Sequence, residues 1–286
     1  MKISHLGLQA FYQTATTLNI TLAAKQLGLT QSALSQRISA LESELEVTLF
    51  LREPKGLLLT EVGERLLRFS QMNQKVEEEL LLELQGSKTE LAGTIRIAAY
   101  SSILRSVILP TMSEFLLKYP NIQVHFQAYE TGELENVLKR ASADIIIMDY
   151  EWDKKGIAKK LLGFEEYVVI AGTKIPTGSK SRDDTYLDHD AGDMTTENFF
   201  KANTNAPKKW KRSFMGDVYG IIDGVESGLG RAVMSKHLIN ENKKIKIVKS
   251  MKSIKRPVCM YYYEQPYYSR LMKEVIQVLE NEITPF

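Results

Sequence analysis

Apolar residues recur at helical spacing over the first 45 positions and predict three short helices. The third helix carries an apolar stripe on Leu34, Ile38 and Leu41, and Thr30 stands where it can cap the first turn. A three-residue segment containing glycine separates it from the second helix, which Thr21 could cap. Two short helices joined by such a turn are typical of a helix-turn-helix.

The face opposite that stripe is polar but almost uncharged. It carries short hydroxyls and an amide, where an ordinary solvated helix would carry Glu and Lys. Side chains of this kind fit the major groove of DNA, and Gln36 could pair with an adenine edge. Serine hydroxyls there could reach bases or phosphates, and a helix N-terminus favours a phosphate. The residues expected to contact DNA are Thr30, Gln31, Ser32, Ser35, Gln36, Arg37, Ser39 and Arg52.

Two of these residues are arginines with an open role. Arg37 lies at the edge of the apolar stripe, which favours a phosphate contact or an internal ion pair over base readout. Two short apolar runs flank Pro54-Lys55-Gly56 and predict a β-hairpin, or wing. Arg52, at the base of that wing, is a candidate for a phosphate or minor-groove contact, or for a salt bridge to a nearby glutamate.

A long helix is predicted from Glu61 to about Gln85, with Thr60 as its cap. Its apolar residues are spaced alternately by four and three positions, which is a heptad seam with one polar member. A helix of this length favours a dimerisation or linker role over that of a plain core helix. The seam consists of Val62, Leu66, Phe69, Asn73, Val76 and Leu80.

Beyond Gly93, predicted strands alternate with predicted helices, which implies an α/β fold with a largely parallel sheet. The chain is therefore divided into a winged helix-turn-helix DNA-binding domain at 1–60, a linker or dimerisation helix at 61–87 and an α/β domain at 88–286.

Composition limits the function only weakly. The 286 residues carry a net charge of +2, so a nucleic-acid partner must be argued from the local motif. The one cysteine, Cys259, is expected to be a buried structural thiol, and the basic run 208–212 is expected to be a solvated face. We expect neither a metal nor a cofactor, because the four histidines lack metal-ligand spacing. A signal peptide and a membrane-spanning run are not evident, which favours a cytoplasmic location.

The N-terminal region resembles the winged-helix domain of LysR-type transcriptional regulators. The resemblance is carried by the segments 21–27, 30–35, 41–42, 49–52 and 59–63. Looser matches at 93–97, 108–110 and 228–230 extend it over nearly the whole chain. One departure is Glu46, where the family usually has glycine; a left-handed backbone there would be strained by about 1 kcal/mol.

The resemblance implies that the α/β domain is a two-lobed, periplasmic-binding-protein-like effector domain. Lobe 1 would cover about 93–163 and 267–286, and lobe 2 about 164–266. A small molecule would lie between strand ends and helix N-termini. Hydroxyls facing carboxylates would suit an amino acid with an extra amine, although Asp193 could equally be a helix cap. The expected effector-binding residues are Ser101, Ser102, Glu130, Thr131, Asp149, Asp193, Met194 and Thr195.

A narrower resemblance links 35–38 and 188–200 to the ArgP/LysG-like regulators of lysine and arginine export. It implies lysine, arginine or another amino acid as the effector. The expected partners are double-stranded DNA, this small molecule and further copies of the chain in a homodimer or homotetramer; RNA polymerase is left open, and no membrane is expected. The alternative is an α/β small-molecule-binding protein or an enzyme with an accessory DNA-binding domain. Catalysis is disfavoured because the sequence lacks GxSxG, GxGxxG and P-loop motifs.

Overall fold

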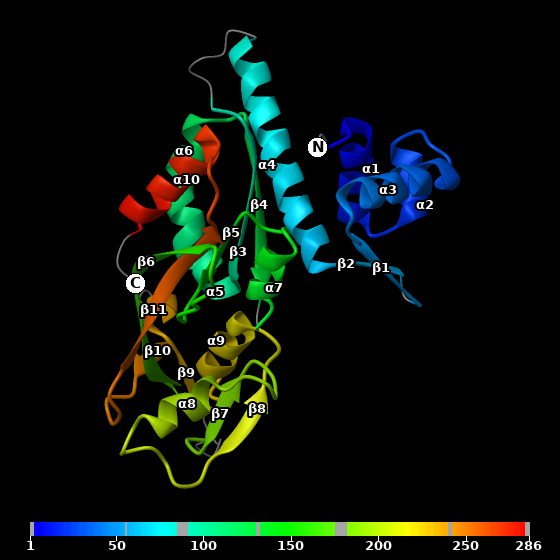
Figure 1. The fold of residues 1–286 in the computed structure, drawn as a ribbon. Helices are drawn as coiled ribbons and strands as arrows, with labels where there is room; N and C mark the ends of the chain where they lie inside the picture. Colours follow the sequence, from blue (N-terminus) through cyan, green and yellow to red (C-terminus); the bar gives the residue numbers. More distant parts are fainter. Residues whose placement is uncertain are drawn as a thin grey trace. The chain divides into compact units, whose positions relative to one another are not determined.

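The computed structural model describes residues 3–54, 56–84, 91–129, 132–174, 182–239 and 242–283. The chain folds into two compact units (Figure 1). One unit contains Met1–Gly93 with the short segments Lys139–Ser142 and Tyr267–Leu271. The other contains Thr94–Leu138, Ala143–Pro266 and the chain from Met272 onward.

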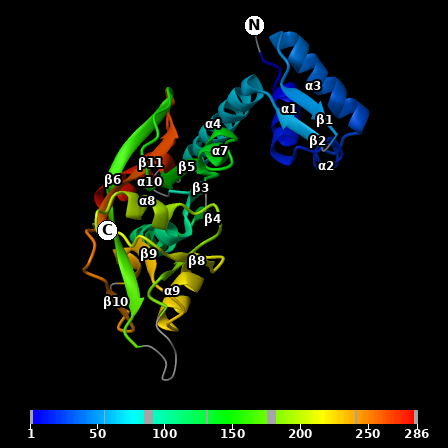
Figure 2. The same cartoon turned by 90° about the horizontal axis from the view of Figure 1, so that it is seen from below.

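Three helices open the first unit: α1 (His5–Thr17), α2 (Ile20–Gln26) and α3 (Gln31–Leu45). Figure 2 shows them gathered with the hairpin into one small domain. Leu34, Ile38 and Leu41 of α3 are all buried, as the apolar stripe predicts. Leu41 packs beside Phe11 of α1, so burial of the stripe fixes which face of α3 points outward.

Side-chain caps set where the second and third helices begin. Thr30 caps α3, because its hydroxyl accepts the backbone N–H of Ala33 at 3.2 Å. The predicted cap of α2 is wrong. Asn19 holds that place, accepting the N–H of Leu22 at 3.0 Å, and α2 begins earlier, at Ile20. The Thr21 hydroxyl instead accepts a hydrogen bond from the Gln31 amide.

The end of α3 carries the departure from the family pattern. Glu46 has φ 55° and ψ 38°, which is the left-handed conformation that a glycine adopts without strain. The Glu46 N–H donates to the carbonyls of Glu42 and Ser43, so the helix still ends in a hydrogen-bonded turn. The chain therefore keeps the turn and places a residue with a Cβ in it.

The wing is an antiparallel hairpin of β1 (Phe50–Glu53) and β2 (Gly56–Leu59), with Phe50 opposite Leu59. Thr60 then caps the next helix by accepting the N–H of Gly63 at 3.0 Å. A Cβ on Gly63 would lie 2.3 Å from the carbonyl oxygen of Leu49, so only glycine allows this close approach.

The long helix α4 (Glu61–Leu84) buries one side and exposes another. Leu67 is buried in the core that contains Phe11. Leu66 of the predicted seam is half-buried and packs against that core, and Asn73 is exposed. The other four apolar members are between 37% and 53% exposed: Val62, Phe69, Val76 and Leu80. Within the described residues, these four positions of α4 therefore remain largely uncovered.

The second unit is built on a seven-stranded sheet with the strand order β10-β6-β11-β5-β3-β4, in which β9 also pairs with β6. Its strands are β3 (Gly93–Tyr100), β4 (Ile122–Tyr129), β5 (Ile145–Met148), β6 (Ile157–Gly172), β9 (Ala232–Ser235), β10 (Ile245–Ile247) and β11 (Ile254–Tyr263). The pairing of β3 with β5 is parallel, as expected. The expectation of a largely parallel sheet is wrong for β6, which pairs antiparallel with β9, β10 and β11.

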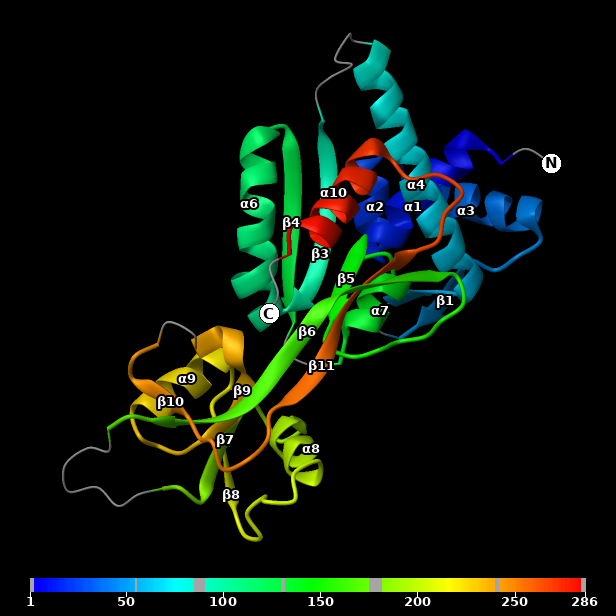
Figure 3. The same cartoon turned by 90° about the vertical axis from the view of Figure 1, so that its left-hand side faces the viewer.

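The strands β6 and β11 run side by side along the length of this unit (Figure 3). The strand β6 contributes Ile157 to one hydrophobic core and Ile170 to a second, and β11 contributes Tyr261 to the first. The remaining elements are α5 (Ser101–Ile103), a π-helical turn (Leu104–Ile108), α6 (Leu109–Lys118), α7 (Leu134–Lys139), β7 (Thr185–Asp188), α8 (Thr195–Lys201), β8 (Lys211–Phe214), α9 (Val218–Glu226), a 3₁₀ turn (Lys236–Ile239) and α10 (Arg270–Asn281).

Two expectations about single residues are settled by burial. Cys259 is fully buried as a free thiol, and this burial raises its pKa. Arg212, expected on a solvated face, is instead paired with the buried carboxylate of Asp188. The solvated interpretation is wrong there because parallel pairing of β7 with β8 places the two residues near each other.

Candidate nucleic-acid interface and ligand pocket

The polar face of α3 lies open to solvent. Gln31, Ser32, Gln36 and Ser39 are exposed and Ser35 is half-buried. Thr30 is exposed as well, with its hydroxyl 3.0 Å from that of Ser32. These side chains are short or uncharged, so the helix presents donors and acceptors with little steric bulk. The face has the shape and chemistry that a groove-reading helix requires.

The two arginines of this region are placed differently. Arg37 is half-buried and Arg52 on β1 is exposed. Neither forms an ion pair with any carboxylate of the described residues. The alternatives of an internal ion pair for Arg37 and a wing salt bridge for Arg52 therefore receive no support from the described part of the chain.

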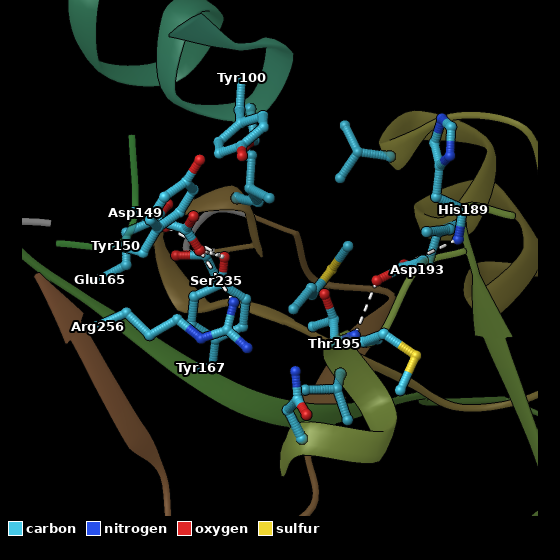
Figure 4. Close-up of a pocket in the computed structure, with 18 of the residues that line it drawn as sticks. Tyr100, Asp149, Tyr150, Glu165, Tyr167, His189, Asp193, Thr195, Ser235 and Arg256 are labelled. Carbon is cyan, nitrogen blue, oxygen red and sulfur yellow. Dashed lines mark hydrogen bonds and ion pairs between the residues drawn. The ribbon is translucent and has the colours of Figure 1, made fainter. Parts of the chain in front are cut away.

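A cavity of about 430 Å³ lies in the second unit, within the size range of small-molecule sites (Figure 4). Five predicted residues line it: Ser102, Asp149, Asp193, Met194 and Thr195. Ser101 is not among the lining residues, although its buried hydroxyl has no hydrogen-bond partner in the described segments. Glu130 and Thr131 lie outside the described residues.

The Asp193 carboxylate accepts hydrogen bonds from two backbone N–H groups. One carboxylate oxygen accepts the N–H of Thr195 at 2.8 Å, next to the start of α8, and the other accepts the N–H of His189 at 3.1 Å. Figure 4 shows these three residues on one side of the cavity. The cap position of α8 is Met194, so Asp193 is not the helix cap; its carboxylate instead bonds the turn before α8, and Asp193 still lines the cavity.

The other side of the cavity holds groups that strand-end reasoning missed (Figure 4). Asp149, after β5, pairs with Arg256 of β11 at 3.0 Å and accepts the hydroxyl of Tyr167 of β6 at 3.0 Å. The Arg256 guanidinium also lies 4.5 Å from the centroid of the Tyr167 ring. Arg256 and Tyr167 lie within strands rather than after them, and the available signal was the charge of Arg256 in a predicted strand.

Glu165 of β6 also lines the cavity and is only 1% exposed. Burial, followed by the charge of Asp149, raises the pKa of Glu165 to about 7. Its neighbour His237 lies 3.5 Å away, measured from Nδ1 to Oε1, and burial lowers the pKa of His237 to about 4. His237 is therefore neutral near pH 7, with its Nδ1 2.7 Å from the hydroxyl of Ser235.

Two further tyrosines reach the cavity from other strand ends. Burial raises the pKa of Tyr100 well above its usual value, and it raises the pKa of Tyr150 to about 12. Both phenols therefore keep their protons at neutral pH. The Tyr150 hydroxyl donates to Glu135 at 3.2 Å. The cavity wall thus combines protonated phenols with carboxylates.

The described residues contain no group of three or more His, Cys, Asp or Glu side chains arranged to hold a metal ion. Within the same residues, no helix is long and apolar enough to cross a membrane.

The sequence matches two family models. The model described as bacterial regulatory helix-turn-helix protein, lysR family, matches residues 7–64, and the LysR substrate binding domain model matches residues 88–284. The chain belongs to the LysR family. This LysR-family protein is a transcription regulator with a DNA-binding helix-turn-helix and an effector-binding domain.

Relatives of this LysR-family chain are themselves named as regulators. A transcriptional regulator of Pseudomonas aeruginosa is 39% identical over 124 residues, which cover 42% of this chain and 39% of that protein. The HTH-type transcriptional regulator LrrA of Synechococcus elongatus is 27% identical over 235 residues, 79% of each chain.

Solved structures show the same fold. ArgP from Mycobacterium tuberculosis aligns over 100% of both chains with a TM-score of 0.77 and 17% identity. LysG from Corynebacterium glutamicum, with bound effector Arg, aligns over 99% of this chain and 98% of its own with a TM-score of 0.75 and 16% identity. At these identities the likeness establishes the architecture and not the ligand.

Proposed function

We propose that this LysR-family chain reads DNA with the exposed face of α3 and senses an amino acid in the 430 Å³ cavity, with lysine and arginine as the first candidates. Such a regulator acts on DNA in the cytoplasm. The DNA-reading part rests on the open, uncharged face made of Gln31, Ser32, Ser35, Gln36 and Ser39. Thr30 and the α3 N-terminus would bind phosphate, as would Arg37 and Arg52.

Assembly follows from the exposed stripe of α4. Phe69, Val76 and Leu80 are too apolar and too regularly spaced to be left in water along one helix. We propose that a second copy covers this stripe and that the active protein is a homodimer or a homotetramer. A two-fold dimer would require an inverted-repeat site with half-sites about one helical turn apart.

The charge of the cavity supports the amino-acid part. Asp149, Asp193 and Glu165 place three carboxyl groups on its wall, whereas Arg256 is the one Lys or Arg side chain among the described lining residues. An excess of carboxyl groups favours a ligand with a positive group. Ser102, at the start of the helical segment that follows β3, can donate to a ligand carboxylate. LysG, which shares the fold, is described with bound Arg.

Binding measurements test the DNA-reading part. Gln36→Ala and Ser35→Ala should reduce the preference for operator over random DNA about tenfold each, while binding to random DNA stays constant. Ser113→Ala, at an exposed serine of α6, is the matched control and should change neither. Wild-type discrimination in both α3 variants would show that this face does not read DNA.

Calorimetry with the 20 common amino acids tests the sensing part. The proposal expects saturable binding of at least one of them at one site per chain. If none binds the full-length protein, the amino-acid proposal falls and the DNA-binding proposal stands.

A further inference from the structure

Glu165 lacks the counter-charge that its position should provide. Its register partner across the β6–β11 ladder is Arg256. The Arg256 guanidinium, however, bonds to Asp149 at 3.0 Å and not to Glu165. The Glu165 carboxyl is therefore almost fully buried in the cavity wall, while Arg256 is paired with a different carboxylate, that of Asp149.

The hydrogen bonds of Tyr167 indicate where a proton resides. Its hydroxyl lies 3.0 Å from Asp149 Oδ2 and 3.2 Å from Glu165 Oε2. A phenol has one proton and can donate it to only one carboxylate. Asp149 is also paired with Arg256, so its oxygen is the better acceptor for the phenol proton. The second contact is then satisfied when Glu165 carries a proton and donates it to the Tyr167 oxygen.

The other carboxyl oxygen of Glu165 is left available. Oε1 is buried and has no partner within hydrogen-bonding geometry among the described residues, although the Ser235 hydroxyl interacts with the same carboxyl and His237 Nδ1 lies 3.5 Å from Oε1. The charged and titratable groups around Glu165 are Asp149 after β5, Tyr167 on its own strand, Arg256 on β11 and His237 in the turn after β9. Of these only Arg256 is a cation near pH 7, and it is already paired. A buried acceptor without a donor destabilises the free protein and is a place for a ligand donor.

We propose that Glu165 is the specificity-determining residue for a cationic amine or guanidinium of the effector, and that it releases its proton to solvent when that group binds. In the free protein the carboxyl is neutral. On binding, the ligand cation stays charged, Glu165 becomes the carboxylate that bonds it, and one proton passes to the buffer. The inference rests on the proposed amino-acid effector. It adds that Glu165 selects for a cationic side chain and that binding releases one proton.

The pH dependence follows from the free protein. Glu165 is protonated below pH 7 and ionised above it, since its pKa is about 7. A bound cation lowers the pKa of Glu165 from this raised value, so binding of the cation competes with binding of the proton at low pH. Affinity for a cationic ligand should then be about tenfold higher at pH 8 than at pH 6. His237, whose pKa is about 4, does not titrate in this range.

The experiment uses calorimetry on the full-length chain with two matched pairs of probes. L-Arginine is compared with neutral L-citrulline, and L-lysine with neutral L-norleucine, at pH 6, 7 and 8 in buffers of different ionisation enthalpy. A cationic probe should bind with release of about half a proton at pH 7. Its affinity should rise about tenfold from pH 6 to pH 8, whereas the neutral partner shows neither effect.

Two variants assign the effect to this residue. Glu165→Gln should abolish both the proton release and the preference for the cationic probe, while Glu166→Gln should retain them. Glu166 is the matched control because it pairs with Lys236 at 3.0 Å and does not line the cavity. If Glu165→Gln does not fold, proton release by the wild type in two buffers decides the question by itself.

Three results would overturn the inference. One is a cationic probe that binds without proton release, and another is a Glu165→Gln variant with the wild-type pH profile. A third is binding of neutral amino acids only, which would support the proposal of an amino-acid effector and contradict the proposed role of Glu165. Failure of every amino acid to bind would remove both.

Discussion

Nη1 of Arg256 lies 3.0 Å from Oδ2 of Asp149 and joins the first part of β11 to the residue that follows β5 at the cavity wall. The Asp149 side chain is 10% exposed and that of Arg256 28% exposed, so the pair is largely out of water. Asp149→Asn would leave the guanidinium without its counter-ion. Because the Arg256 side chain remains partly exposed to solvent, we expect a loss of only about 2 kcal/mol in the free energy of unfolding, measured with urea.

The matching double variant separates the ion pair from general damage. Asp149→Asn with Arg256→Gln removes both charges and should recover part of the lost stability. A single variant within 0.5 kcal/mol of the wild type, on the scale of an ordinary surface change, would show that the pair is not a structural link.

Glu46→Gly should stabilise the small helical domain. Glu46 has φ 55°, and a non-glycine residue in the left-handed region costs about 1 kcal/mol. Glycine removes that strain but adds freedom to the unfolded chain, so the expected gain in free energy of unfolding is about 0.5 kcal/mol. Ala40→Gly, at an exposed position inside α3, is the control and should lose about 1 kcal/mol. A loss of stability in Glu46→Gly would contradict the strain argument.

Substitutions in the α4 stripe should change the oligomeric state in opposite directions. Phe69→Lys places a charge in the exposed seam and should weaken self-association at least tenfold in sedimentation equilibrium. Asn73→Leu removes the polar residue from the seam and should strengthen association. Gln74→Lys, exposed but outside the seam, should behave like the wild type. A Phe69→Lys protein of unchanged mass in solution would place the interface elsewhere.

Local sequence signals were enough for the first unit. The cap at Thr30, the wing turn and the start of α4 each depend on a few neighbouring residues, so their side chains could be assigned from sequence. The one error there, at α2, is a choice between Asn19 and Thr21, two good caps two positions apart.

The cavity was predictable only in part. Ser102 and Asp149 follow strands β3 and β5, and the strand-end rule finds such residues. Glu165 and Arg256 lie inside β6 and β11, and they meet only through antiparallel pairing of segments about 90 residues apart. No local pattern specifies that register. The usable hint was the glutamate and the arginine within predicted strands, where burial of a charged group requires a partner.

The free energy of unfolding should depend on the protonation of Glu165 even when no ligand is bound. In the folded state its pKa is about 7, against 4.5 for the unperturbed group. The contribution of the protonated carboxyl is fully present below about pH 4.5 and is lost as the pH rises through 7. Between pH 5 and pH 8 the wild type should therefore lose on the order of 3 kcal/mol relative to Glu165→Gln, whose side chain does not titrate.

Urea unfolding of the wild type, Glu165→Gln and Glu166→Gln at pH 5, 6.5 and 8 measures this difference. Other titrating groups are shared by the three proteins, so their effects cancel in the comparison with Glu165→Gln. The Glu166→Gln curve should follow the wild type, apart from a small offset for its exposed ion pair with Lys236. A stability difference between wild type and Glu165→Gln that stays constant from pH 5 to pH 8 would mean that Glu165 is already ionised in the folded protein.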